Sequence, residues 1–218
     1  KFEINLTDED IREVFDSGGL IGICMHDGRM PGKKFRRKLR AVRAYPEKAK
    51  RLYAQMFLTN VFHIVKVNRE RALNSGASEL AGGSKNAAAP THARAAHEAP
   101  GARPSPAEGG IPAIWKTVFL GSDNDGIVDP FNTYETAADL PAFREKIIEA
   151  LNTQDRPYME DFRILSLPSE QPMEVAELRE LMMGLRPEQI AERIFYGNIR
   201  EFLQRYFTRA YRFGEAAV

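Results

Sequence analysis

Two short apolar segments, residues 20–25 and 117–120, have the hydrophobic pattern of buried β-strands. Both consist mainly of aliphatic, β-branched and aromatic side chains without polar alternation, and Gly19 and Gly121 border them. Such continuous apolar runs are typical of parallel strands that are covered on both faces. The first segment follows a predicted helix, and this order is half of a βαβ unit. We therefore expect an α/β protein with two buried parallel strands.

Apolar residues recur at helical spacing over most of the remaining chain. The first helix begins after Thr7, a favoured N-cap residue, and its first three residues are acidic, as the helix dipole prefers. A long helix begins at Pro46 and has one broad apolar face. Asn198 and Glu201 have the spacing of a helix cap, and Gly197 is expected to end the preceding helix. Shorter helices are predicted over residues 140–151, 173–183 and 187–196, and from Asn198 onward.

Three segments lack this periodicity. We expect loops over the polar, glycine-punctuated residues 26–43 and over residues 152–172, where three prolines exclude a long helix. Residues 75–110 are rich in alanine, glycine, proline and serine and have almost no large apolar side chain. Such a segment cannot bury enough surface to offset its chain entropy, so we predict a disordered insertion between residues 1–74 and 111–218.

Composition limits the classes of function that the chain can have. With 218 residues, 43% of them hydrophobic, the chain can form one domain with a sizeable core. The net charge of +1 gives no overall reason to expect a nucleic acid or a membrane as partner. Cys24 is the single cysteine, which excludes an internal disulfide and suits a reducing, cytoplasmic location. No apolar run approaches the roughly 20 residues of a membrane helix.

The segment after the second predicted strand resembles a known family. Residues 121–126, Gly-Ser-Asp-Asn-Asp-Gly, are similar to the last-strand segment of renal (membrane) dipeptidase-like metallohydrolases of the amidohydrolase superfamily, although Asn124 replaces an aromatic residue. The segment around residues 5–22 resembles the approach to the family's penultimate strand, and Gly197-Asn198 resembles its closing helix. The resemblance covers roughly residues 2–25 and 115–207.

This family has a (β/α)₈ TIM-barrel fold, which typically takes about 250 residues. Two predicted strands cannot close a barrel. The resemblance therefore implies a mostly helical, carboxy-terminal part of an amidohydrolase barrel, whose amino-terminal part is missing from this chain. A stand-alone helical module is the alternative.

The resemblance also implies a role for Asp123. In such hydrolases this carboxylate takes a proton from a metal-bridging water, which attacks the amide, and then delivers a proton to the leaving amine. His26, Arg29, Asn124 and Asp125 are expected to line the site for a small peptide or amide substrate. From the residues alone, Asp123 is equally an Asx-type turn residue at a strand end, and Asp125 is expected to hold the turn.

The implied divalent metal, zinc in this family, would take most of its ligands from outside this chain. The chain has four histidines and neither a His-x-His pair nor a His-Glu-x-x-His motif. His92 and His97 lie in the predicted insertion, and His63 lies at the margin of a helix, where a solvated or hydrogen-bonded histidine is common. The chain alone is thus expected to be inactive. A calcium loop is excluded, because Val128 stands where that loop needs glycine.

A dense basic run lies within the predicted loop of residues 26–43. A run with this many positive charges could bind a phosphate backbone or an acidic partner. Only one aromatic residue interrupts it, however, and its charge is balanced elsewhere in the chain. We interpret it as a solvated loop, or as a contact with the missing domain or with a second subunit. The competing hypothesis to the hydrolase is therefore a non-catalytic interaction or oligomerisation module. The run comprises Lys33, Lys34, Arg36, Arg37, Lys38, Arg40 and Arg43.

Overall fold

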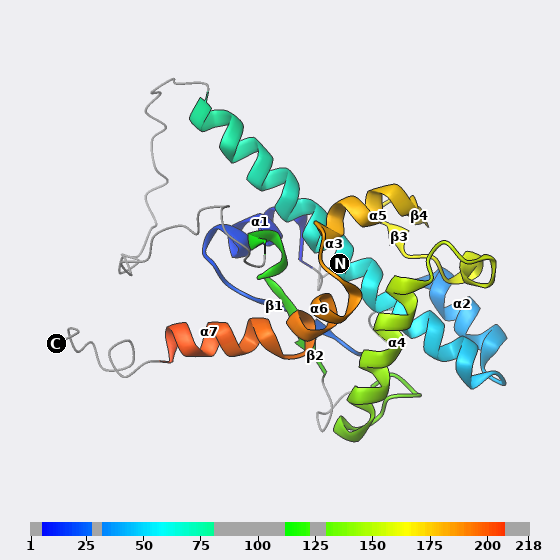
Figure 1. The fold of residues 1–218 in the computed structure, drawn as a ribbon. Helices are drawn as coiled ribbons and strands as arrows, with labels where there is room; N and C mark the ends of the chain where they lie inside the picture. Colours follow the sequence, from blue (N-terminus) through cyan, green and yellow to red (C-terminus); the bar gives the residue numbers. More distant parts are fainter. Residues whose placement is uncertain (1–5, 28–31, 81–111, 123–129, 208–218) are drawn as a thin grey trace.

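The computed structural model describes residues 6–27, 32–80, 112–122 and 130–207, and for residues 76–80 only the backbone. Helices make up most of this part of the chain, and the longest of them, α3, runs through its middle (Figure 1). In chain order the helices and strands are α1 (Asp8–Asp16), β1 (Ile21–Cys24), α2 (Lys33–Val42), α3 (Pro46–Leu80), η1 (Ala113–Trp115), β2 (Val118–Gly121), η2 (Ala137–Asp139), α4 (Leu140–Asn152), η3 (Pro157–Phe162), β3 (Leu165–Ser166), β4 (Gln171–Pro172), α5 (Val175–Met182), α6 (Pro187–Glu192), η4 (Arg193–Gly197) and α7 (Asn198–Tyr206).

The central helix α3 begins at Pro46, as predicted. The sequence predicted one buried face, but residues 52–59 of α3 are buried around the whole circumference, and they include the polar Gln55 and Thr59. The reason is that α3 is the central helix, against which α1, α2, α4, α5 and the strands all pack. A helix enclosed on all sides is expected to be apolar all round. Its few polar side chains bond to the main chain instead: Thr59 donates to the carbonyl of Gln55 at 2.7 Å.

The far end of α3 extends beyond the predicted boundary. The disordered insertion was expected from Ser75, but the helix continues to Leu80, and the Ser75 hydroxyl donates to the carbonyl of Arg71 at 3.0 Å. Once a helix is nucleated, each further residue adds one hydrogen bond, so a long helix readily extends into an alanine-containing segment. The prediction was therefore wrong for residues 75–80. The rest of the predicted insertion, residues 81–110, lies outside the described residues.

The two predicted strands pair in parallel. Ile21 lies opposite Val118, and Cys24 lies opposite Gly121. Ile21, Ile23 and Val118 are buried in the same core as the inner residues of α3. The other face is only partly covered: Gly22 is exposed and Phe119 is half-buried. The expectation that both faces are covered is thus wrong. On this face Gly22 has no side chain of its own, and the ring of Phe119 lies against it.

The basic run is a helix and not a loop. α2 spans Lys33–Val42 and packs against α3. Its apolar residues Phe35, Leu39 and Val42 follow one another at four and three positions, which places them on one helical face. Phe35 is buried, and Leu39 and Val42 pack partly buried against the core. The loop prediction failed because the many charged residues of this segment concealed this short apolar stripe.

The helices predicted on either side of the strands are present. Thr7 caps α1, and Thr7 and Asp10 form a reciprocal capping box, in which the hydrogen bonds from Thr7 lower the pKa of the Asp10 carboxyl. Gly18, with φ of 69°, follows the end of the helix, as glycine often does. In α4, Phe143, Ile147 and Leu151 are buried, as predicted.

Residues 152–172 form mostly irregular structure, as predicted, with the short helix η3 and the antiparallel pair β3·β4. α5 follows and ends at Met183 and Gly184, which both have positive φ.

The carboxy-terminal helices are continuous. Gly197 was predicted to end one helix and Asn198 to cap the next, but α6, the π-helical η4 and α7 follow one another without a break. Asn198 has helical dihedral angles and is buried (2% exposed). Its amide nitrogen donates to the carbonyls of Trp115 at 2.6 Å and Val118 at 2.7 Å. Glu201 does not reach back to cap the helix but pairs with Arg193.

The described part of the chain is thus a mostly helical α/β structure with two parallel strands and one short antiparallel pair. Within these residues no barrel is formed. Among the described helices, none has the length and apolar character that crossing a membrane requires.

Candidate functional site

The carboxyl ends of β1 and β2 lie at the same edge of the sheet. Because the strands are parallel and Cys24 lies opposite Gly121, the chain leaves both strands side by side. The amide of Met25 donates to the carbonyl of Gly121 at 3.1 Å and extends the pairing by one residue. His26 and Asp27 follow β1, and Ser122 follows β2. This edge is where parallel α/β proteins place their ligand-binding groups.

His26 lies in this edge and is buried (7% exposed). It forms an isolated antiparallel bridge with Pro130, and the amide of Phe131 donates to the carbonyl of Met25 at 3.1 Å. The chain that leaves β2 at Ser122 therefore returns at Pro130 next to the end of β1. Ser122 and Pro130, which flank the intervening segment, therefore both lie at the strand ends.

Asp27 is held by two side chains from distant parts of the chain. Its Oδ1 accepts a hydrogen bond from the Tyr53 hydroxyl at 2.7 Å, and its Oδ2 accepts one from the Asn132 amide at 2.8 Å. Both carboxylate oxygens therefore have a partner, which fixes the orientation of this side chain. We call Asp27, Tyr53 and Asn132 the strand-end cluster.

Tyr53 reaches the strand-end cluster from the middle of α3. Its ring is buried (3% exposed) and stacks on Phe131, with ring centroids 4.4 Å apart. Burial raises the pKa of the Tyr53 hydroxyl far above its usual range, and the hydrogen bond to Asp27 raises it further. Tyr53 therefore keeps its proton and acts as a hydrogen-bond donor to Asp27 across the usual pH range.

An aromatic layer supports the cluster from the core side. Phe131 and Tyr134 both pack against Phe143 of α4, with centroids 6.0 and 4.8 Å from it. The buried hydroxyls of Thr133 and Tyr134 have no hydrogen-bond partner among the described residues. Burial also raises the pKa of Tyr134. Such a packed layer holds the strand-end cluster in one geometry.

Of the residues predicted for the site, the structure places His26 at the strand ends. Arg29, Asp123, Asn124 and Asp125 lie outside the described residues. Asp27 directly follows His26 but was not selected from the sequence, and its partners Tyr53 and Asn132 were missed as well. Tyr53 has the helical spacing of a core residue, and nothing in the sequence marks its hydroxyl as part of a site.

The described residues do not supply a metal centre. They contain no group of three His, Cys, Asp or Glu side chains that could hold a metal ion. Both carboxylate oxygens of Asp27 already accept hydrogen bonds, one from Tyr53 and one from Asn132. His63, expected at a helix margin, is 2.8 Å from Asp8 of α1 and pairs with it. His92 and His97 are outside the described residues.

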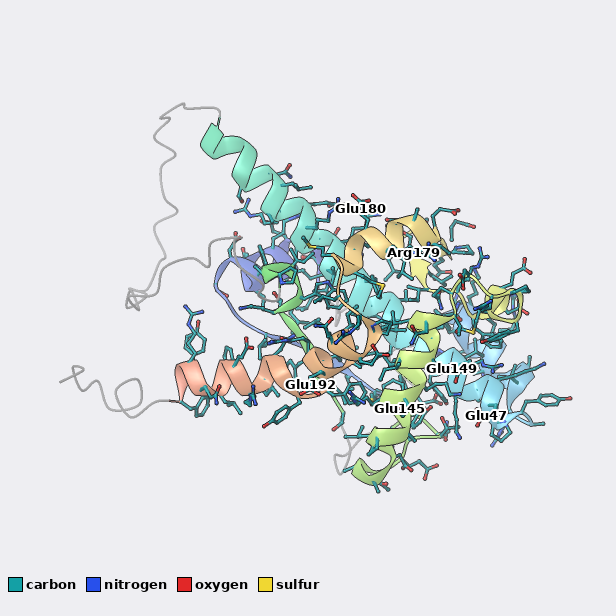
Figure 2. All side chains as sticks on the ribbon, viewed as in Figure 1. Glu47, Glu145, Glu149, Arg179, Glu180 and Glu192 are labelled. Carbon is teal, nitrogen blue, oxygen red and sulfur yellow. The ribbon has the colours of Figure 1, made fainter. Side chains whose placement is uncertain are left out.

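A surface hollow of about 210 Å³ lies elsewhere, between the end of α4, α5 and the start of α6. Leu151, Val175, Leu178 and Met182 line it together with Asp155 and Arg179, of which Arg179 is labelled on α5 in Figure 2. It shares no residue with the strand-end cluster. Its volume is below the roughly 300 Å³ at which small-molecule pockets begin.

The chain matches no protein-family model, no curated protein and no solved structure.

Proposed function

We propose that this chain is the carboxy-terminal part of a metal-dependent hydrolase with a (β/α)₈ barrel, which cleaves a small peptide or amide bond. The parallel register of β1 and β2 is the observation that supports this most. It places His26 and Ser122, the residue before Asp123, at one edge of the sheet, and barrel enzymes hold their catalytic groups at the equivalent edge. The similarity of residues 121–126 to the dipeptidase-like family suggests the type of reaction, which is hydrolysis of a peptide or amide bond.

In this proposal Asp123 is the acid/base carboxylate. It accepts a proton from the attacking water and delivers one to the leaving amine, a task that suits a carboxylate at the mouth of a site. Bound metal would lower the pKa of that water. Because the described residues do not form a metal centre, the zinc ligands would be residues outside the described part, mostly from outside this chain. His26, Arg29, Asn124 and Asp125 would contact the substrate.

Hydrolysis of a panel of dipeptides by the full protein, supplied with zinc, tests the proposal. We expect Asp123→Asn to lower kcat by about 10²- to 10⁴-fold, the range for one general acid/base, while the zinc content measured by atomic spectroscopy stays unchanged. Asp161→Asn is the matched control, because it removes one exposed carboxylate of η3 that has no part in the proposed site, and it should keep most of the activity. Retained turnover in Asp123→Asn excludes Asp123 from this role, and loss of zinc assigns it to the metal instead.

A non-catalytic interaction or oligomerisation module is the second candidate. The observation that favours it is the exposed, strongly basic helix α2, which the hydrolase proposal leaves without a role. The two candidates differ in a simple measurement. The module predicts no zinc-dependent hydrolysis of any dipeptide, together with a partner or a second copy bound in light-scattering chromatography.

A further inference from the structure

One face of α2 presents cations only. Four of them follow the helix at steps of four, three and three residues, which places them in a line along one side. All four side chains are exposed. We call this line the α2 basic face; it comprises Lys33, Arg37, Arg40 and Arg43.

The first half of this arrangement is electrostatically unfavourable for α2 itself, although Arg40 and Arg43 at its end agree with the helix dipole. Lys33 and Lys34 lie in the first turn, where the helix dipole disfavours positive charge, and Gly32 provides no side-chain cap. Lys33 and Arg37, and then Arg37 and Arg40, are like-charge neighbours at helical spacing, which destabilises an isolated helix. Departures from local stability rules of this kind are expected at functional sites.

The neighbouring residues do not neutralise the α2 basic face. Lys34 and Lys38 donate to the main-chain carbonyls of Glu170 at 3.1 Å and Asp161 at 2.9 Å and so attach the helix to the adjoining loops. Within the residues that the structure describes, Lys33, Arg37, Arg40 and Arg43 form no ion pair.

The carboxylates at the adjacent contact of α3 with α4 are already occupied. Glu47 pairs with Lys50 and Lys146, and Glu149 pairs with Lys146 and Arg51. Figure 2 shows Glu47 and Glu149 near each other at this contact. These two carboxylates are therefore not available to the α2 basic face. The carboxylate of Glu170 lies beside Gly32 at the start of the helix but forms no ion pair in the described part of the chain.

We propose that the α2 basic face binds the phosphate backbone of a single-stranded nucleic acid. Guanidinium groups match phosphate oxygens in pairs, and three of the four cations are arginines. Tyr45 lies just beyond the helix with 58% of its surface exposed, and the Lys48 ammonium is 5.1 Å from its ring centroid. An exposed ring at the end of a cationic line is a platform on which a base can stack.

A membrane surface fits the same helix less well. The larger apolar residues of α2, Phe35, Leu39 and Val42, pack against the core, so this helix offers no large apolar side chain to a lipid layer. The inference reverses the expectation, drawn from the net charge, that no nucleic acid is bound. The net charge of +1 averages over the chain, whereas binding depends on the local field. The inference is independent of the hydrolase proposal.

Fluorescence anisotropy with a labelled oligonucleotide of about 16 nucleotides tests this proposal, at salt concentrations from about 50 to about 200 mM. We expect the triple variant Lys33→Gln/Arg37→Gln/Arg40→Gln to bind at least tenfold more weakly. The slope of log K against log salt should fall by about 2, because three phosphate contacts on a single strand are lost at about 0.7 each. Tyr45→Ala should weaken binding by about tenfold without changing the slope.

The control variant, Arg156→Gln/Arg179→Gln/Arg200→Gln, loses the same number of positive charges at three exposed arginines outside α2. It should bind the oligonucleotide nearly as tightly as the wild type does. The α2 variant should melt at the same or a higher temperature than wild type, since it relieves repulsion within the helix. Equal loss in both triple variants overturns the proposal. So does equal affinity for a poly-glutamate peptide of matched charge, or binding to phosphatidylserine vesicles without binding to the oligonucleotide.

Discussion

Asn198 ties the carboxy-terminal helices to the parallel strands. β2 accepts hydrogen bonds from β1 through the carbonyls of Thr117 and Gly121, so the alternate carbonyl of Val118 faces away from β1. The amide of Asn198 donates to this carbonyl and to that of Trp115. One side chain thus satisfies two main-chain groups and closes the outer edge of β2, an edge that could otherwise pair with another chain.

We expect Asn198→Ala to lower the free energy of unfolding by about 2–3 kcal/mol, because two carbonyls lose their donor in a buried position. Urea denaturation followed by circular dichroism measures this change. Asn152→Ala is the control: Asn152 is exposed at the end of α4, and its loss should change stability by less than about 0.5 kcal/mol. Equal effects of the two substitutions would contradict the role of Asn198 at the edge of β2.

The residues of the strand-end cluster show why sequence reasoning stopped at His26. Strand ends are visible in the pattern of apolar residues, so the position of His26 beside β1 could be predicted. Tyr53 and Asn132, however, meet Asp27 across 26 and 105 positions of the chain. Their contacts depend on how α3 packs against the strands, and neither residue type nor spacing encodes this without the fold.

At the scale of elements, apolar periodicity predicted most helices well and failed where another feature dominated the segment. In α2 the cations conceal a stripe of three apolar residues. In the terminal helices Gly197 suggested a break, yet the buried Gly197 lies against the side chain of Arg193 and the helix continues through it. At Gly197 tertiary packing thus overrides local propensity, whereas α2 agrees with it, because arginine, lysine, leucine and alanine are good helix formers.

Helices α3 and α4 are joined by charges as well as by packing. Lys146 of α4 lies 3.1 Å from Glu47 and 2.6 Å from Glu149, and its side chain is 13% exposed. Phe57 of α3 meets the edge of Phe143 of α4 with centroids 5.3 Å apart. The hydrogen bond from Lys50 and then that from Lys146 lower the pKa of Glu47 to about 2.

This lowered pKa predicts a defined dependence on pH. Above about pH 4.5, the ordinary pKa of a glutamate, Glu47 is ionised in both states and its pairs stabilise the fold fully. As the pH falls toward about 2, the unfolded chain takes up a proton first, so this stabilisation is lost. Glu47→Gln should therefore be less stable than wild type at neutral pH, by a small amount because the side chain is largely exposed. The difference should shrink toward about pH 2.

Urea denaturation of both proteins over this pH range measures the effect. Glu70→Gln is the control, since Glu70 is an exposed carboxylate in the interior of α3 with no ion pair in the described part of the chain. Its stability should remain parallel to that of wild type at every pH. A constant gap between Glu47→Gln and wild type from neutral to acid pH would rule out this linkage.

At the scale of the molecule, the residues before and after the predicted insertion share one core. Phe62 of α3 meets the edge of Trp115 with ring centroids 5.5 Å apart, and the Trp115 indole donates to the carbonyl of Leu181 at 2.9 Å. The parallel pair likewise joins β1 from one side with β2 from the other. The two predicted ranges of residues, 1–74 and 111–218, therefore depend on each other for their packing. Sequence composition predicted an insertion between the two ranges, but it gave no sign that the flanking parts interlock.

This interlocking leads to a prediction for the whole chain. Residues 81–110 contain no leucine, isoleucine, valine, phenylalanine, methionine, tryptophan or tyrosine, so they have little to add to a core. Replacing them with a glycine–serine linker of equal length keeps the entropy of closing the connection nearly unchanged. We expect the melting temperature, measured by calorimetry, to stay within about 4 °C of wild type, which corresponds to about 1–2 kcal/mol for a chain of this size. A larger drop would mean that this segment packs on the core that α3 organises, and the prediction of an inert insertion would then be wrong.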